Sequence, residues 1–348
     1  MTDIRSMTIE ELELFVTGMG EKKFRAKQLY EWMHKRLCSD FDQMSNLPKG
    51  FRDFLIRECS LGAVREVTRQ ISEIDGTRKY LFSLEDGNVI ESVWMQYHHG
   101  NSVCISSQVG CNMGCRFCAS TIGGCKRSLS PSEMLGQVYE IQRSTGQRVS
   151  NVVIMGSGEP LENYDNVLKF LRLINDPEGL CISHRNITLS TCGIVPRIYE
   201  LADEELAITL AISLHAATDE KRQSIMPIAR KYSLQELLEA CRYYEKKCSR
   251  RLTFEYSLVA GVNDSMEDAR QLAFLLEGLS AHVNLIPVNP VRERSFKRPD
   301  RQGLLAFQNK LEKMKINVTI RREMGRDIDG ACGQLRRRHI GDSLAPVE

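Results

Sequence analysis

The stretch Cys111-Asn-Met-Gly-Cys115-Arg-Phe-Cys118 places three cysteines within eight residues, in the spacing C-x3-C-x2-C. A structural zinc site needs four ligands, which usually come as two separated Cys/His pairs. No second pair follows this stretch, and His98 and His99 lie before it. Three thiolates suit an iron–sulfur cluster that keeps one iron open for another ligand. The stretch therefore predicts an enzyme with a [4Fe-4S] cluster bound by Cys111, Cys115 and Cys118.

The rest of the sequence has the composition of an ordinary globular chain. Hydrophobic residues make up 42% of its 348 residues, and no run approaches the ~20 apolar residues of a membrane span. The first residues carry no apolar signal segment, and the 12 cysteines are scattered. Since disulfides are rare in the cytosol, we expect a cytoplasmic protein with reduced thiols and no membrane partner. The net charge of +2 does not indicate nucleic acid, but basic stretches at 292–301, 321–322 and 336–339 are candidates for phosphate contacts.

The N-terminal quarter of the chain changes from a helical to a strand pattern. Residues 1–60 read as a helical module, because Thr8-Ile-Glu-Glu11 matches a capping box and apolar residues recur at helical spacing. Residues 61–96 read as a β-meander. Its strand segments are expected at 64–70, 78–84 and 89–95, with Asp75-Gly76 and Asp86-Gly87 at the turns.

From about residue 97, strands and helices alternate. Seven segments have a strand pattern, at 103–106, 151–155, 186–190, 207–213, 252–258, 283–286 and 317–320. Helical patterns lie between most of them, and repeated βα units fold into a parallel sheet. About six such units fall short of the eight of a complete barrel. We therefore predict an α/β fold with a partial (β/α)6 barrel at 97–327, followed by a C-terminal segment at 328–348.

Several motifs directly follow strands of this predicted barrel. They are the cysteine stretch, Gly156-Ser-Gly158-Glu159-Pro160, Ser190-Thr-Cys-Gly193, Ser213-Leu214-His215 and Val288-Asn289-Pro290. Because the chemistry of such sheets lies at the carboxyl ends of the strands, we expect these motifs to converge. Each also has an ordinary structural explanation, such as a capping hydroxyl, a buried histidine or a turn asparagine.

The cysteine loop after the first barrel strand resembles that of the radical S-adenosylmethionine superfamily. The resemblance implies that S-adenosylmethionine binds the open iron and is cleaved, after one-electron reduction, to a 5′-deoxyadenosyl radical. In that superfamily a GGEP-like motif after the second strand contacts the methionine amino group. Gly158 and Glu159 match it, although Ser157 interrupts the paired glycines. By the same resemblance, the other residues that would bind S-adenosylmethionine are Ser190, Ser213, Leu214, His215 and Asn289.

Four segments are similar to the RlmN/Cfr family of RNA adenosine methyltransferases. They are Ser106-Ser-Gln-Val-Gly-Cys111, Gly158-Glu-Pro-Leu-Glu-Asn163, Ser213-Leu-His-Ala216 and Asp327-Ile-Asp329-Gly-Ala-Cys332-Gly-Gln-Leu335. The similarity extends from the N-terminal helices almost to residue 340. Adenine C2 is an electron-poor carbon that cannot attack a sulfonium methyl as an ordinary nucleophile. The family therefore loads the methyl group onto a protein cysteine first.

This resemblance implies catalytic roles for three residues. Cys332 would take a methyl group from one S-adenosylmethionine, and the radical made from a second would abstract hydrogen from that S-methyl group. After the carbon adds to the base, Glu91 would accept the C2 proton. Cys104 would then attack the Cys332 sulfur, so that the methylated base leaves as a transient disulfide forms. Without the resemblance, Cys104 and Cys332 would be interpreted as structural cysteines and Glu91 as an ordinary glutamate of a strand.

The resemblance implies a product, substrates and partners. The product would be 2-methyladenosine, in 23S rRNA near the peptidyl-transferase centre and in tRNA at the adenosine 3′ of the anticodon. Basic residues of the N-terminal module would bind the RNA backbone, namely Lys22, Lys23, Arg25, Lys27, Lys35 and Arg36. We expect a monomer that receives its electron from a flavodoxin- or ferredoxin-type donor.

Two alternatives to this function stay open. A Cfr-like enzyme would methylate adenine C8 with the same chemistry and the same two cysteines, although residues 118–124 and 213–216 are more similar to the C2 branch. A non-catalytic RNA-binding protein with a structural cluster is an alternative of another class. A fourth cluster ligand would favour it, and none lies at a plausible spacing.

Overall fold

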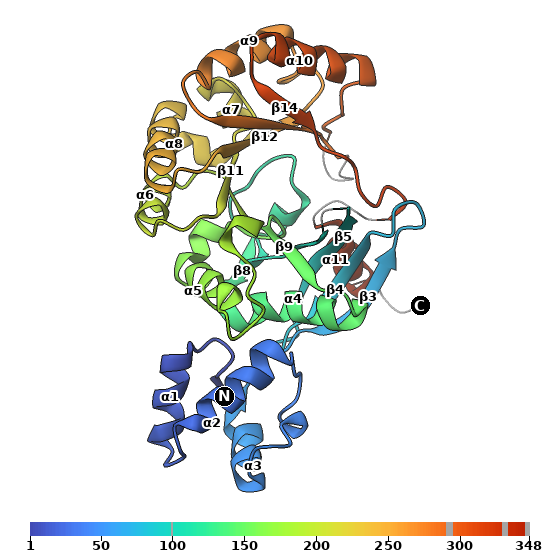
Figure 1. Cartoon of the computed structure of the whole chain (residues 1–348). Coiled ribbons are helices and arrows are strands. Elements are labelled where there is room, and N and C mark those ends of the chain that lie inside the picture. Colours follow the sequence, from blue (N-terminus) through green and yellow to red (C-terminus); the bar gives the residue numbers. More distant parts are fainter. Residues whose placement is uncertain (99, 290–294, 329–332, 345–348) are drawn as a thin grey trace.

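The computed structural model describes residues 1–98, 100–289, 295–328 and 333–344. Figure 1 shows a lobe of helices formed by the N-terminal residues, a sheet with helices packed on it, and a C-terminal helix that returns to the sheet. Within the described residues, no helix is both long and apolar enough to cross a membrane.

The N-terminal lobe is the predicted helical module. Its elements are β1 (Thr2–Asp3), α1 (Ile9–Gly18), α2 (Phe24–Tyr30), η1 (Glu31–Lys35), η2 (Phe41–Gln43), α3 (Lys49–Glu58) and β2 (Cys59–Ser60). The capping box is confirmed, because the Thr8 hydroxyl accepts from the Glu11 amide while the Glu11 carboxylate accepts from the Thr8 amide. Strands β1 and β2 pair in parallel, so the two ends of the module lie side by side.

Buried polar contacts attach this module to helix α4 (Pro131–Thr145). The Ser132 hydroxyl donates to the Asp3 carboxylate at 2.6 Å, and His34 Nδ1 shares a hydrogen bond of 2.8 Å with the Tyr139 hydroxyl. His34 is completely buried. Burial, aided by the positive charge of Arg5, lowers the pKa of His34 to about 3, so the ring is neutral at physiological pH.

This buried histidine predicts an acid-sensitive stability. Between the unfolded pKa of 6.5 and the folded pKa of about 3, the unfolded chain binds a proton that the folded chain does not. The free energy of unfolding should therefore fall as the pH falls, by up to about 1.4 kcal/mol per pH unit. Urea unfolding of the wild type and of His34→Gln between pH 7.5 and 4 measures this. The variant should be less stable at pH 7.5 and lose less stability on acidification; parallel curves would contradict the prediction.

The central sheet has ten strands, in the order β14-β13-β12-β11-β10-β9-β6-β5-β4-β3. Its bounds are β3 (Arg65–Ile71), β4 (Arg78–Ser83), β5 (Val89–Tyr97), β6 (Gly100–Cys104), β9 (Val149–Ile154), β10 (Ile187–Thr191), β11 (Thr209–Ser213), β12 (Leu252–Leu258), β13 (Ala281–Pro287) and β14 (Asn317–Ile320). From β6 to β14 all neighbouring strands are parallel, as predicted. The meander β3–β5 pairs antiparallel with β6 and so continues the same sheet.

Helices cover the parallel part of the sheet (Figure 1). After α4 they are α5 (Tyr164–Asn175), α6 (Val195–Asp203), α7 (Asp219–Ile225), α8 (Leu234–Cys248), α9 (Met266–Leu275) and α10 (Arg301–Lys313). Helix α11 (Gln334–Leu344) packs instead against β5 of the antiparallel meander. Four short 3-10 helices in the described residues of this part of the chain are η3 (Ala119–Thr121), η4 (Pro160–Asn163), η5 (His184–Asn186) and η6 (Pro227–Arg230). Helices α4, α5, α6, α8, α9 and α10 lie between successive strands of the parallel sheet, which confirms the predicted alternation of strands and helices. A short antiparallel pair, β7 (Gln108–Gly110) and β8 (Cys125–Ser128), was also not expected.

Candidate active site

A cavity of about 620 Å³ lies at the carboxyl ends of the parallel strands. Strands β6, β10 and β11 contribute Cys104, Ser190 and Ser213 to its lining. Cys118 of the cysteine stretch and Asn289 after β13 also line it. The predicted convergence of these motifs is therefore found in the structure.

The cysteine stretch is held in a tight loop between β7 and β8. The Cys111 amide donates to the Gly124 carbonyl at 3.2 Å, and the Asn112 side chain accepts from the Cys125 amide at 2.8 Å. Gly110 has a positive φ of 87°, and a Cβ on it would lie 2.0 Å from the Gly124 carbonyl oxygen. The loop closes only because this position has no side chain.

The three thiols lie close enough to influence one another. Burial raises the pKa of Cys111 to about 12, and the Cys118 thiol adds to this rise. The pKa of Cys115 is raised by burial and by both of its partners. Such thiols need positive charge nearby to become thiolates. Within the described residues, no group of three or more His, Cys, Asp and Glu side chains is arranged around a single metal ion.

Arg222 supplies positive charge next to this loop. It is completely buried; its Nε donates to the Leu214 carbonyl at 3.1 Å and one Nη to the Cys192 carbonyl at 2.7 Å. Its other amino group, Nη1, has no hydrogen-bond partner in the described part of the chain. The guanidinium counteracts the rise in the Cys115 pKa. The buried thiols and this cation therefore fit an iron–sulfur cluster with net negative charge.

Two glycines of the loop allow a matched test of its closure. Gly110 and Gly123 both have a positive φ, but a Cβ on Gly123 would meet no atom within 4 Å. Gly110→Ala should therefore lose most of the bound iron and sulfide, whereas Gly123→Ala should keep it and cost only about 1 kcal/mol of backbone strain. Iron analysis and the visible absorption of anaerobically reconstituted protein measure this. Equal iron contents in the two variants would contradict the role of Gly110.

The loop after β9 forms the wall behind the cavity. Gly158 has a φ of 115°, and a Cβ on it would lie 2.7 Å from the Ser107 hydroxyl. The buried Glu159 carboxylate accepts from the Leu161 amide at 3.1 Å and from the Cys192 amide at 2.7 Å. Burial raises the pKa of Glu159. Gly156 lines the cavity, whereas Gly158 and Glu159 do not, so these two residues shape the wall and their predicted contact with S-adenosylmethionine stays a prediction.

His215 presents a neutral ring to the cavity. Its Nδ1 accepts from the Ser257 amide at 2.9 Å, so the ring proton is assigned to Nε2. Burial and the charge of Arg222 lower its pKa to about 3. The Phe117 ring packs edge-on against it at 4.8 Å between centroids. His215 can therefore donate a hydrogen bond without carrying charge. Leu214 is buried behind it and is not part of the cavity lining.

Glu91 lies on β5, on the same strand face as Val93 and Met95, but of these three only Val93 and Met95 are part of the cavity lining. Val93 pairs with Cys104 of β6. The buried Glu91 carboxylate forms an ion pair of 3.1 Å with Lys79 of β4 and accepts from the Gly333 amide at 2.7 Å. The predicted methyl carrier, Cys332, lies outside the described residues. Two positions later, Gln334 lines the cavity.

Basic side chains line the same cavity. They are Arg298, Arg321, Arg322 and Arg326. Part of the predicted phosphate-contacting surface therefore lies at the cavity, whereas Arg292 and Arg294 lie outside the described residues. Arg336 is buried, and its Nε donates to the Val89 carbonyl at 2.9 Å. Arg298 and Arg326 pair with Glu323, which also lines the cavity. Arg321 and Arg322 are therefore the cavity cations that would best suit a polyanionic substrate such as RNA.

Sequence reasoning missed two buried cations of the site. Lys79 directly precedes the buried apolar run Tyr80-Leu81-Phe82, in a strand that is buried on both faces, and a lysine next to such a run was the available signal. Arg222 lies in a short polar helix, and no local pattern distinguishes it from a solvent-exposed arginine.

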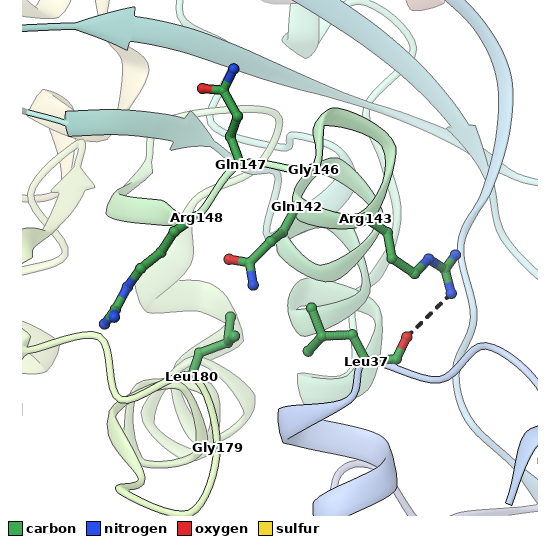
Figure 2. A pocket seen from close by; sticks show the side chains of 8 residues that line it. All are labelled: Leu37, Gln142, Arg143, Gly146, Gln147, Arg148, Gly179 and Leu180. Carbon is green, nitrogen blue, oxygen red and sulfur yellow. Dashed lines mark hydrogen bonds between the residues drawn. The ribbon is translucent and has the colours of Figure 1, made fainter.

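Figure 2 shows a second cavity, of about 480 Å³, next to the N-terminal module. Leu37 lies on one side, and Gln142, Arg143 and Arg148 lie near the end of α4. Arg143 donates to the Leu37 carbonyl at 3.3 Å. None of the predicted site residues lines this cavity, so it belongs to the junction between the module and α4.

Comparisons with known proteins cover both the N-terminal module and the sheet. The family model of the radical SAM superfamily matches residues 105–273, and that of the ribosomal RNA large subunit methyltransferase N-terminal domain matches residues 2–61. A probable dual-specificity RNA methyltransferase RlmN of Lachnospira eligens is 61% identical over 98% of this chain and 98% of its own. That of Lachnoclostridium phytofermentans is 59% identical over 98% and 96%. The solved structure of a radical SAM methyltransferase from Sphaerobacter thermophilus has a TM-score of 0.92 at 40% identity, over 96% of this chain and 99% of its own.

Proposed function

Because this chain belongs to the RlmN family of dual-specificity RNA methyltransferases, within the radical SAM superfamily, we propose that it makes 2-methyladenosine in 23S rRNA and in tRNA. The observation that supports the proposal most directly is the single cavity lined by Cys118, Cys104 and Gln334. A predicted cluster ligand, the predicted resolving cysteine and a close neighbour of the predicted methyl carrier therefore meet at one place.

The site residues divide into those that hold cofactors and those that carry the methyl group. Cys111, Cys115 and Cys118 bind the [4Fe-4S] cluster, and the charge of Arg222 offsets theirs. When bound, the cluster and S-adenosylmethionine supply a 5′-deoxyadenosyl radical. The residues that bind S-adenosylmethionine in this proposal are Gly158, Glu159, Ser190, Ser213, Leu214, His215 and Asn289. The cavity lining includes Ser190, Ser213, His215 and Asn289, which supports the proposal for these four.

Three residues handle the methyl group and the proton in this proposal. Cys332 carries the methyl group as a thioether. Glu91 accepts the proton that leaves adenine C2. The adduct radical also loses one electron, which the oxidised cluster would accept. The Cys104 thiolate then forms a bond to the Cys332 sulfur, and the electron pair of the broken carbon–sulfur bond stays on the CH2 carbon attached to adenine, which takes up a proton to become the methyl group. The position of Cys104 in the cavity lining supports its role, and the disulfide with Cys332 is a transient state of this cycle.

A cysteine variant with product mapping tests this reaction. Wild-type enzyme with reductant and RNA should yield 2-methyladenosine, and Cys332→Ala should yield none, because the methyl group then has no carrier. Cys181→Ala is the matched control, since Cys181 is an exposed cysteine outside the cavity, and it should retain wild-type activity. Mass spectrometry of nuclease-digested RNA is the measurement. Methylation by Cys332→Ala at the wild-type rate would contradict the carrier mechanism.

The same digest separates the two alternatives. A C8-methylating, Cfr-like enzyme would yield 8-methyladenosine from the wild type. A non-catalytic RNA-binding protein with a structural cluster would yield neither product while still binding RNA.

The N-terminal module is proposed to bind the RNA backbone. Lys22, Lys27 and Lys35 are exposed and form no ion pair among the described residues. Lys23 and Arg36 are already paired, with Glu13 and Glu31, both at 2.8 Å. Arg25 is partly buried and donates to Gln28. The three unpaired lysines are therefore the strongest candidates for phosphate contacts.

Salt dependence of RNA binding tests this assignment. The Lys22→Ala/Lys27→Ala/Lys35→Ala variant should bind RNA more weakly and reduce the slope of log K against log salt by roughly 2, because each lost phosphate contact removes about 0.7–0.9 from the slope. A Lys23→Ala/Arg36→Ala control should change the slope less. Filter binding at salt concentrations between about 50 and 200 mM measures the slopes of both variants. An unchanged slope in the triple variant would contradict the proposed surface.

The proposal also covers the location of the enzyme, its oligomeric state, its electron donor and the roles of its domains. We propose a cytoplasmic monomer whose electron comes from a flavodoxin- or ferredoxin-type protein. We also propose that the units at 1–60, 61–96, 97–327 and 328–348 serve as RNA-binding module, meander, radical-generating core and carrier segment.

A further inference from the structure

The β-meander holds the C-terminal segment on both sides of Cys332, and we propose that Lys79 is a positioning residue that acts through Glu91 to fix the backbone directly after this cysteine. The role of Cys332 as methyl carrier rests on the proposed function. The contacts that hold the segment are present in the structure and do not depend on the role of Cys332.

The first anchor is the Glu91 carboxylate at the start of α11. One oxygen accepts from the Gly333 amide at 2.7 Å, and the other accepts from the Arg336 amide at 2.5 Å. Arg336 adds a hydrogen bond from its side chain to the Val89 carbonyl. The first turn of α11 is therefore fixed to β5 by three hydrogen bonds, and Figure 1 shows α11 next to β5.

The second anchor lies before Cys332, at the turn between β3 and β4. The Asp327 carboxylate accepts from the Ser72 hydroxyl at 2.6 Å and from the Glu73 amide at 2.7 Å. The Gly325 amide donates to the Asp75 carboxylate at 2.9 Å. Both anchors thus come from the meander, which identifies it as a platform for the carrier segment.

Lys79 makes the first anchor possible. Its side chain is completely buried and that of Glu91 is 5% exposed. The two lie diagonally on neighbouring antiparallel strands, because Glu91 pairs with Leu81. A buried carboxylate stays ionised only when a charge of opposite sign offsets its lost hydration. Ionised Glu91 accepts at both oxygens, whereas the protonated acid would present a hydrogen to one of the two amides.

The position of Gly333 leaves little room for movement. It has a φ of 82°, and a Cβ on it would lie 2.8 Å from the Ser120 amide nitrogen. Ser120 lies two residues after the predicted cluster ligand Cys118. The backbone after Cys332 is therefore confined between the Glu91 carboxylate and the turn that follows the cluster loop.

Residue-resolved amide hydrogen exchange tests the role of Lys79 without any catalytic step. In cluster-loaded protein, Lys79→Met should speed exchange of the Gly333 and Arg336 amides by about tenfold or more, and Lys79→Arg should restore most of the protection. Amides of β4 and β5 should stay protected in both variants, because a general loss of structure would expose them too. Unchanged exchange at Gly333 and Arg336 in folded Lys79→Met would overturn the proposal.

Lys221→Met is the matched control. Lys221 pairs at 2.7 Å with the buried Asp268, which accepts from the Ser265 amide at the start of α9. Its loss should leave exchange at Gly333 and Arg336 unaffected.

If Lys79→Met does not fold, Glu91→Gln replaces it as the test. The glutamine side chain keeps one acceptor oxygen but turns its NH2 donor toward the other backbone N–H, so exchange at Gly333 and Arg336 should become faster. If the Gly333 and Arg336 amides of Glu91→Gln exchange as slowly as those of the wild type, the proposed role of Glu91 in holding them is wrong.

RNA methylation and amide exchange, measured on the same variants, separate this inference from the proposed function. Lys79→Met should slow methyl transfer from Cys332 to RNA, with the RNA affinity unchanged and with rescue by Lys79→Arg. If the wild type fails to methylate RNA but the exchange responses occur, the positioning role stands and the proposed function fails. If RNA is methylated and the exchange responses are absent, the proposed function stands and the positioning role fails.

Discussion

The contact between Glu91 and the start of α11 is the interaction on which the site depends. It joins residues 242 positions apart in the chain, since the Glu91 carboxylate accepts from the Gly333 amide. Lys79 compensates the charge of that carboxylate inside the protein. This contact attaches the residues directly after Cys332 to a buried carboxylate. The strand that presents Glu91 also places Val93 opposite Cys104, so one strand organises both sides of the cavity.

The parallel sheet brings the loops of the site together. Strands β6, β9, β10, β11, β12 and β13 end at the same edge, so the loops after them meet without further specification. Buried charges then complete the site. Arg222 faces the cluster loop, Glu159 ties the β9 loop to β10, and His215 stays neutral beside the cavity. Each is buried and hydrogen-bonded, which fixes its geometry before any ligand binds.

The local sequence predicted those features that depend on nearby residues. The cysteine spacing, the Thr8 capping box and the strand-ending motifs depend on short stretches, and the structure has them at the expected places. Lys79 and Arg222 were missed because their burial arises from strands and loops distant in sequence. Helix α11 was missed because its residues are mostly polar and its first turn is held by Glu91. Gly158 and Glu159 match a ligand-binding motif, and their contact with S-adenosylmethionine stays a prediction; the sequence did not predict that the Glu159 carboxylate accepts from the Cys192 amide after β10.

The passage of the methyl group through a protein cysteine is the central claim, and isotope tracing tests it most directly. Enzyme whose Cys332 carries an unlabelled methyl group, verified by peptide mass, is given reductant, one equivalent of RNA and S-adenosylmethionine with a deuterated methyl group. A cysteine carrier predicts that the first methyl group at adenine C2 contains no deuterium, and that deuterium appears first in the methyl group on Cys332. Deuterium in the first methylated adenosine, with the Cys332 methyl group unconsumed, would contradict it.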